Sequence, residues 1–201
     1  MYIYGMKKAR LLLLALASMI VLCAFVFPGD EKKEPVKVKW YSFLEAVELS
    51  KKSDKKKKIF IDVYTDWCGP CKMLDKNTFS HPVIAKYLNE NFIPVKLNAE
   101  MKDTIVYNNF TFLPSPGPRM AHQLAASLLS NKMQYPTIVF LDENFNMITP
   151  VAGYRAPHEM EPLVKYIGSD IFRTKTYDNF ILAFQGEIPP PPPPPVPYGP
   201  N

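Results

Sequence analysis

Residues 59–72 read IFIDVYTDWCGPCK, and this stretch decides the expected fold. Its first six residues form a short apolar, β-rich run that is typical of a buried strand. Cys68 and Cys71 follow, three positions apart, where the chain is expected to open a helix. A strand that runs into such a pair places the first thiol at a helix N-terminus, where a thiolate is stabilised. The spacing therefore predicts a redox-active dithiol.

Two other roles for this cysteine pair fit the sequence less well. A zinc site needs more ligands, but there is no second cysteine pair, and His81, His122 and His158 lack the short spacing of zinc ligands. A purely structural disulfide would close a very small loop and would restrict the unfolded chain little. We therefore expect exchange chemistry at Cys68 and Cys71, with no metal and no cofactor.

Length and charge limit the remaining possibilities. With 201 residues, of which 47% are hydrophobic, the chain can bury one sizeable core. The formal net charge is +5, and the first 34 residues supply +2 of it. The +3 that remains is too small to indicate binding to nucleic acid.

The N-terminal segment, residues 1–28, predicts a signal peptide or a membrane anchor. Lys7, Lys8 and Arg10 precede an uncharged apolar stretch at residues 11–27. That stretch is long for a cleaved signal, short for a bilayer-spanning helix, and lacks a good small-residue cleavage site, which slightly favours an anchor. Either interpretation predicts that the rest of the chain is translocated.

Hydrophobic periodicity predicts one α/β domain with a linker before it and two segments after it. The predicted parts are the linker at 29–39, the domain at 40–170, a C-terminal extension at 171–188 and a proline-rich tail at 189–201. The elements expected within the domain are helices at 40–49, 83–88, 122–129 and 157–167, and strands at 59–64, 93–97, 137–141 and 147–151. This order describes an α/β sandwich with a mixed central sheet flanked by helices.

Residues 40–168 resemble a thioredoxin-fold domain of the kind found in exported bacterial thioredoxin-like proteins. The resemblance is carried by Trp67-Cys68-Gly69-Pro70-Cys71-Lys72, Asp62, Val95-Lys96-Leu97-Asn98, Tyr135-Pro136-Thr137 and Gly153. Two features depart from the classical family pattern. The helix after Lys72 lacks a kinking proline, and an insertion at 101–121 precedes the strand that follows the expected cis-proline.

The residues and the resemblance together imply a role for each site residue. Cys68 is expected to be the nucleophile, because a helix N-terminus lowers the pKa of a thiol. Cys71 is expected to resolve the mixed disulfide, and Asp62 to accept the proton that Cys71 loses. The resemblance also implies a cis bond before Pro136 that presents the Tyr135 backbone to an extended substrate.

The turn residues Trp67, Gly69 and Pro70 are expected to cap and stiffen the dithiol loop beside the substrate. These features predict a protein-disulfide reductase or isomerase in the periplasm or cell envelope, acting on disulfide-containing envelope proteins. In an oxidising compartment such an enzyme needs an electron donor, which implies a membrane disulfide reductase as partner. The alternative hypothesis is a non-catalytic binding or scaffold protein that uses the proline-rich tail at 189–201 for interaction.

Overall fold

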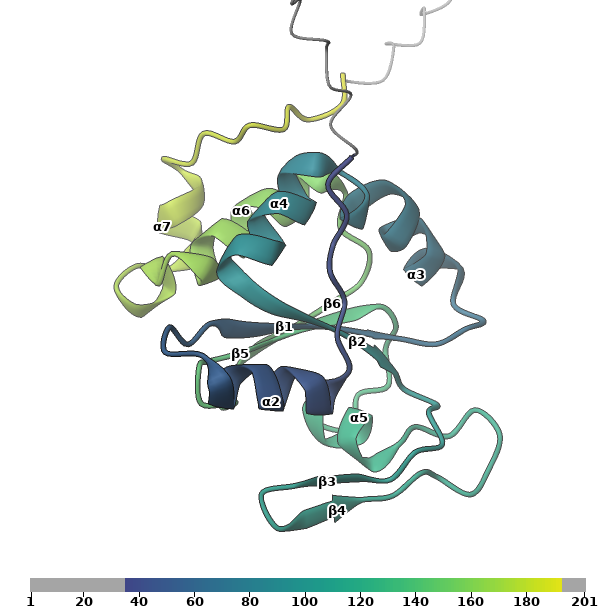
Figure 1. The fold of residues 1–201 in the computed structure, drawn as a ribbon. Helices are drawn as coiled ribbons and strands as arrows, with labels where there is room; N and C mark the ends of the chain where they lie inside the picture. The colour runs from purple at the N-terminus through teal and green to yellow at the C-terminus, as the bar shows by residue number, and fades with distance from the viewer. Residues whose placement is uncertain (1–34, 193–201) are drawn as a thin grey trace, which may run out of the picture. The chain divides into compact units, whose positions relative to one another are not determined.

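The computed structural model describes residues 35–192, which form a four-stranded sheet between two layers of helices (Figure 1). The predicted signal or anchor and most of the proline-rich tail lie outside the described residues. No helix within 35–192 has the length and apolar character needed to cross a membrane. In chain order the elements are α2 (Phe43–Lys52), β1 (Lys58–Tyr64), α3 (Gly69–Met73), the π-helical segment η1 (Leu74–Phe79), α4 (Pro82–Asn91), β2 (Phe92–Asn98), β3 (Ile105–Tyr107), β4 (Phe110–Phe112), α5 (Gln123–Leu128), β5 (Thr137–Leu141), β6 (Met147–Ala152), α6 (Pro157–Gly168), the 3₁₀ segment η2 (Ile171–Arg173) and α7 (Tyr177–Ile181).

The central sheet is mixed, as the sequence predicted. Its strand order is β2-β1-β5-β6. Strands β1 and β2 are parallel, in a register that sets Asp62 opposite Lys96. Strand β5 is antiparallel to β1, and β6 is antiparallel to β5. The predicted α/β sandwich is therefore confirmed, with the long, buried strand β1 at the centre of the sheet.

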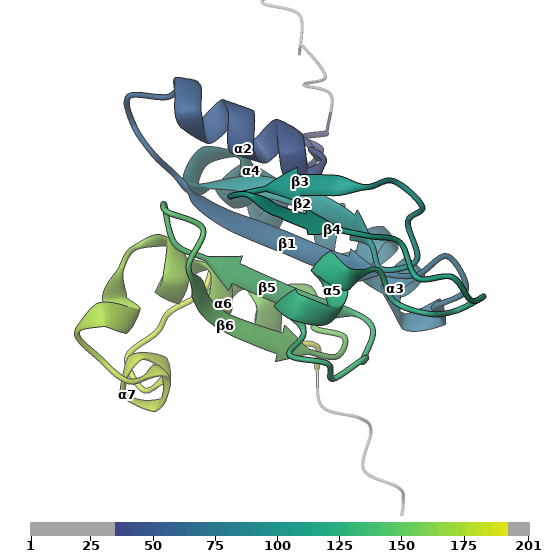
Figure 2. The same cartoon turned by 90° about the horizontal axis from the view of Figure 1, so that it is seen from below.

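Strand β1 divides the core between the two faces of the sheet. Ile59, Ile61 and Val63 belong to the cluster that includes α2 and α5, whereas Phe60 belongs to the cluster that includes α4 and α6. Figures 1 and 2 show these two helix pairs on opposite sides of the sheet. Because side chains alternate along a strand, Asp62 faces the same side as Phe60. The sequence thus inserts a carboxylate among apolar side chains on the α4 and α6 side.

The first helix begins later than the predicted range 40–49. Ser42 and Glu45 form a capping box, in which the Ser42 hydroxyl accepts the Glu45 N–H at 3.3 Å and Glu45 Oε2 accepts the Ser42 N–H at 2.7 Å. Trp40 therefore lies outside the helix, and its ring packs edge-on against Phe79 at 4.9 Å. Periodicity alone assigned Trp40 to the wrong element because the sequence does not show which face of the sheet its side chain covers.

The insertion at 101–121 contains an ordered hairpin, β3–β4, which the sequence prediction left as a loop. Asn108 and Asn109 form its turn with φ of 49° and 60°, a left-handed backbone that asparagine tolerates better than most residues. Tyr107 of the hairpin packs edge-on against Phe43 of α2 at 5.3 Å. The insertion is thereby attached to the same side of the sheet as α2.

The C-terminal extension packs on α6 through aromatic side chains. The Tyr166 ring lies 5.2 Å from the ring of Tyr177 and 5.3 Å from that of Phe180, both in α7. Such contacts bury large apolar surfaces that α6 alone would expose. The extension therefore adds to the core that lies behind Asp62.

Candidate active site

The two cysteines lie between the end of β1 and the start of α3. Cys68 is the N-cap residue of α3, and its Sγ accepts the backbone N–H of Cys71 at 3.2 Å. The two residues are joined by a disulfide and are only 4% and 2% exposed. Pro70 fits in the first helical turn because no hydrogen bond is needed from its nitrogen there. Gly69 and Pro70 are exposed, so the turn between the two cysteines lies at the protein surface.

Asp62 is completely buried on β1 and is only partly satisfied. Its Oδ2 accepts a hydrogen bond from Lys96 Nζ at 2.6 Å. Its Oδ1 has no hydrogen-bond partner among the described residues. Burial raises the pKa of Asp62 from 3.8 to about 6, and the attraction of the Lys96 ammonium only partly opposes this shift. The pKa of this carboxyl therefore lies closer to neutral pH than that of an ordinary aspartate.

Lys96 connects Asp62 to the helix that carries the dithiol. Its ammonium also contacts the carboxylate of Asp75, which lies in η1 about one helical turn after Cys71. Burial alone would lower the pKa of Lys96, but the two carboxylates outweigh this effect and the pKa is raised. Lys96 thus remains an ammonium ion while it bridges β2, β1 and η1.

Aromatic rings surround the Lys96 ammonium on its other sides. The rings of Tyr64, Trp40 and Phe79 have their centroids 4.9, 5.0 and 5.4 Å from Nζ. Aromatic faces stabilise a partly desolvated cation. Sequence reasoning gave no role to Lys96, Asp75 or Trp40. The available signal was a single charged residue at position 96 within an otherwise apolar strand.

The loop before β5 carries the predicted substrate-binding residues Tyr135 and Pro136. The bond between them is cis, and the Pro136 carbonyl accepts the N–H of Gly153 at 2.8 Å. The ring of Tyr135 lies edge-on to that of Trp67 at 6.1 Å. The structure therefore brings the proline loop against the residue that precedes Cys68.

The insertion also reaches the dithiol loop, through Trp67. The Trp67 side chain is 53% exposed, and its Nε1 donates a hydrogen bond to Glu100 Oε1 at 2.9 Å. The guanidinium of Arg119 lies 5.8 Å from the centroid of the Trp67 ring. Trp67 is thus held between the residue before the insertion, the insertion itself and Tyr135. Neither Glu100 nor Arg119 carried a sequence signal that pointed to this site.

No group of three or more His, Cys, Asp or Glu side chains within residues 35–192 is positioned to hold a metal ion. His122 is buried and caps α5 instead. Its Nδ1 accepts the Leu124 N–H at 3.1 Å, so Nε2 carries the proton that is donated to the Asp103 carbonyl at 2.9 Å. Burial lowers the pKa of His122, which favours this neutral form. The histidine ties the start of the insertion to α5.

Comparison with known proteins gives a consistent set of matches. A family model described as "Thioredoxin-like" matches residues 39–143. An uncharacterized protein of Archaeoglobus fulgidus is 30% identical over 107 residues, which cover 53% of this chain and 78% of the relative. The thiol:disulfide interchange protein DsbD of Citrobacter koseri is 26% identical over 142 residues, which cover 69% of this chain but 22% of DsbD. The solved structure of a DsbH oxidoreductase shares 18% identity and a TM-score of 0.48, with 66% of this chain and 85% of the other covered.

Proposed function

The chain belongs to the thioredoxin-like family, and from this premise we propose that it reduces or isomerises protein disulfides in the bacterial cell envelope. The observation that carries the proposal is the position of Cys68 at the N-cap of α3, where its Sγ accepts the Cys71 N–H. That hydrogen bond and the positive end of the helix dipole favour a thiolate at Cys68. The dithiol itself carries two electrons, so the reaction needs no bound cofactor.

The proposed reaction begins with the reduced dithiol. The Cys68 thiolate attacks one sulfur of a substrate disulfide, forms a mixed disulfide and releases one substrate thiolate. The Cys71 thiolate then attacks Cys68 Sγ, closes the Cys68–Cys71 disulfide and releases the second substrate thiolate. The substrate has gained two electrons. If a substrate thiol attacks the mixed disulfide instead, the substrate disulfide is rearranged without net reduction.

Asp62 is the proposed proton acceptor for Cys71. The attack requires a thiolate, so Cys71 must lose its proton first. With a pKa raised to about 6, Asp62 is a stronger base than an ordinary aspartate and is still mostly ionised at neutral pH. Its Oδ1, which has no hydrogen-bond partner within residues 35–192, would take the proton, while Lys96 holds Oδ2. Lys96 and Asp75 act as positioning residues in this scheme.

Substrate is proposed to bind across Trp67, the Gly69–Pro70 turn and the loop of Tyr135 and Pro136. No described residue hydrogen-bonds to the backbone of Tyr135, which leaves its N–H and carbonyl free for an extended peptide. The exposed ring of Trp67 supplies an apolar contact next to Cys68. These contacts suit a flexible protein segment that carries a disulfide.

The envelope location and the electron donor are part of the same proposal. The apolar stretch at 11–27, with basic residues before it, supports export or membrane anchoring of the domain. Disulfides persist in oxidising compartments, so a reductase there needs a supply of electrons from a membrane disulfide reductase. The similarity to a thiol:disulfide interchange protein supports this kind of partner.

Dithiol-dependent reduction of insulin by the full-length protein tests the proposed function. We expect turnover by the intact protein and none by Cys68→Ser. Cys71→Ser should trap substrates as mixed disulfides on Cys68, and the trapped proteins identify the physiological substrates. Cys23→Ser is the matched control, since it removes the remaining cysteine, and it should leave turnover unchanged. Absence of turnover in the intact protein, with no trapping by Cys71→Ser, would favour the scaffold hypothesis instead.

A further inference from the structure

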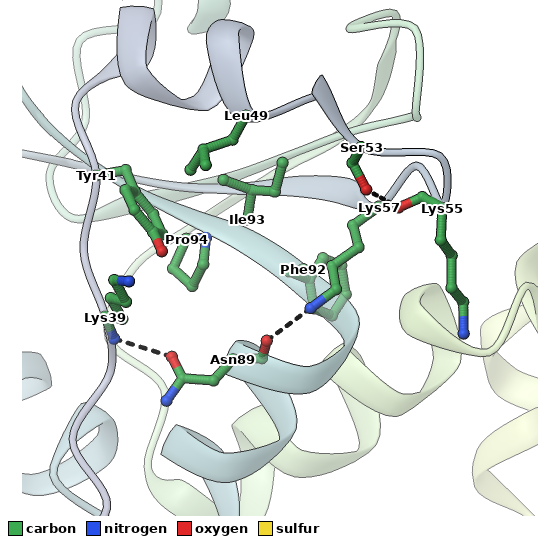
Figure 3. A pocket seen from close by; sticks show the side chains of 10 residues that line it. All are labelled: Lys39, Tyr41, Leu49, Ser53, Lys55, Lys57, Asn89, Phe92, Ile93 and Pro94. Atoms are coloured by element: carbon green, nitrogen blue, oxygen red, sulfur yellow. Dashed lines mark hydrogen bonds between the residues drawn. The ribbon is translucent and has the colours of Figure 1, made fainter. Parts of the chain in front are cut away.

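A pocket of about 330 Å³ lies at the end of the sheet where β1 and β2 begin (Figure 3). Its floor is apolar and includes Tyr41, Leu49, Ile93 and Pro94. Among the described residues, no acidic side chain lines it. The pocket does not include any residue of the candidate active site. An apolar floor without negative charge suits a ligand that combines an apolar part with an anionic group.

Three lysines, Lys39, Lys55 and Lys57, complete the lining of this pocket. Lys57 Nζ donates a hydrogen bond to the backbone carbonyl of Asn89 at 2.8 Å, as Figure 3 shows. That carbonyl belongs to the last turn of α4, where the helix dipole would repel an anion. The Lys57 ammonium offsets the partial negative charge of this helix end, so the charged groups that line the pocket are positive.

The surface around the pocket has the same mixed composition. Leu49 of α2, which lines the pocket, is 38% exposed. Lys58, in contrast, is buried and paired with Glu143 and Asp170, so it does not contribute. Lys37, Lys52 and Lys56 are exposed and close in sequence to the lysines that line the pocket, whereas Lys51 is paired with Glu48 at 3.1 Å. Lysines around an exposed apolar side chain are typical of surfaces that lie on an anionic membrane.

The chain reaches the domain on this side. Lys39 lines the pocket and follows the apolar stretch 11–27 by only twelve residues. A fully extended chain of that length spans about 40 Å at most. If the apolar stretch enters a membrane, the pocket cannot move farther than this from the lipid headgroups. The connection therefore raises the effective headgroup concentration at the lysines.

We propose that this lysine-rimmed surface docks on anionic phospholipid headgroups of the membrane that holds the N-terminal segment. The lysines pair with the headgroup phosphates, and Leu49 lies at the boundary with the acyl chains. The proposal rests on the anchoring part of the proposed function and is independent of the dithiol chemistry. Each lysine near such a surface improves binding by roughly 5-fold.

Docking on this surface has a consequence for the active site. Lys57 directly precedes β1, whereas Cys68 follows the end of β1 by four residues. Seven residues of strand span about 23 Å. The dithiol therefore faces away from the membrane when the lysines contact it, and remains open to substrates.

Hydrogen exchange of the full-length protein in lipid nanodiscs tests this proposal. We expect amides at residues 49–57 to exchange at least 3-fold more slowly in nanodiscs with 30% phosphatidylglycerol than in pure phosphatidylcholine. The triple substitution Lys39→Glu, Lys55→Glu and Lys57→Glu should abolish the difference. The matched control Lys102→Glu, Lys132→Glu and Lys175→Glu carries the same change of charge on other exposed lysines and should preserve it.

Three outcomes would overturn the proposal. Equal protection in both lipids would assign the contact to apolar side chains alone, and no protection in either would exclude docking. Protection in phosphatidylcholine nanodiscs caused by added inorganic phosphate would indicate a site for a soluble anion instead. Insulin reduction, measured on the same samples, reports separately on the proposed function, because neither set of lysines belongs to the active site.

Discussion

Two buried carboxylates in this protein have nearly the same exposure, but their pKa values are shifted in opposite directions. Asp62 lies on the central strand and Glu161 on α6, and they are 0% and 1% exposed. Each is paired with a lysine, Asp62 with Lys96 at 2.6 Å and Glu161 with Lys165 at 2.7 Å. Yet the pKa of Asp62 is raised to about 6, whereas that of Glu161 is lowered. Low exposure and a lysine partner therefore do not by themselves explain why the two pKa values shift in opposite directions.

The difference lies in the other hydrogen-bond donors. Burial tends to raise the pKa of Glu161 too, but its two oxygens accept the backbone N–H groups of Glu187 at 2.8 Å and Ile188 at 2.9 Å. Although both side chains are almost unexposed, Glu161 lies nearer the protein surface than Asp62, so burial raises its pKa less. Asp62 receives no backbone N–H from the described residues, whereas lysine sharing is common to both carboxylates, because Lys96 also contacts Asp75 and Lys165 also contacts Glu187. A carboxylate whose oxygens accept several hydrogen bonds is stabilised in its ionised form and has a lowered pKa. A buried carboxylate with fewer donors has a raised pKa and takes up a proton more readily.

Replacing Asp62 should have the largest effect, because it removes the group that is ready to take a proton. We expect Asp62→Asn to slow the attack of Cys71 on the mixed disulfide by about 100-fold at pH 7, the low end for the loss of a general base. In the wild type this rate should rise through pH 6 as Asp62 ionises. Rapid-quench measurement of mixed-disulfide decay gives the rate. Glu161→Gln should stay within twofold of the wild type, and a wild-type rate in Asp62→Asn would remove Asp62 from the mechanism.

Replacing Glu161 should instead affect stability. In Glu161→Gln the amide group cannot accept from Lys165 and both backbone N–H groups, so buried donors are left unpaired. We expect a loss of about 3 kcal/mol in the free energy of unfolding and faster exchange at the Glu187 and Ile188 amides. Denaturant titration and hydrogen exchange measure the two effects. Glu90→Gln, which breaks an exposed pair with Lys86, should cost less than about 0.5 kcal/mol; similar losses in both variants would contradict the role of Glu161.

The contrast between local and long-range information explains what the sequence could predict. The strand before Cys68, the helix after it and Asp62 six residues upstream lie in one short stretch, so spacing alone relates them. The α/β sandwich follows from the order and periodicity of the elements. The hairpin β3–β4 was missed, although two asparagines between short β-rich runs are a recognised turn signal.

The partners of the two carboxylates depend on packing between distant segments, which one sequence does not show. Lys96 reaches Asp62 because β1 and β2 pair in one register, and a shift of one residue would send it to the other face. Glu161 is satisfied by a segment that begins 26 residues later. Glu100 and Arg119 meet Trp67 only after the insertion folds back. These contacts follow from the fold as a whole.

The smallest expected effect is a gain in stability when Asp62 is neutral. At pH 4 the Asp62 carboxyl is protonated in the folded protein, and between pH 4 and 6 the unfolded chain releases this proton before the folded protein does. Stability of the wild type therefore falls over this interval and stays lower above it, by up to about 3 kcal/mol. Asp62→Asn has no carboxylate to ionise, which removes this loss of stability, but the substitution also weakens the contact with Lys96. We therefore expect the variant to be about 1–2 kcal/mol more stable than the wild type at pH 7 and equally stable near pH 4. Denaturant unfolding of the disulfide form across pH 4–8 measures the difference. The pKa of Glu161 is lowered, so its ionisation stabilises the folded protein, and Glu161→Gln should lose more stability at pH 7 than at pH 4. If the stability of both variants depended on pH in the same way, the environments of Asp62 and Glu161 would not differ as described.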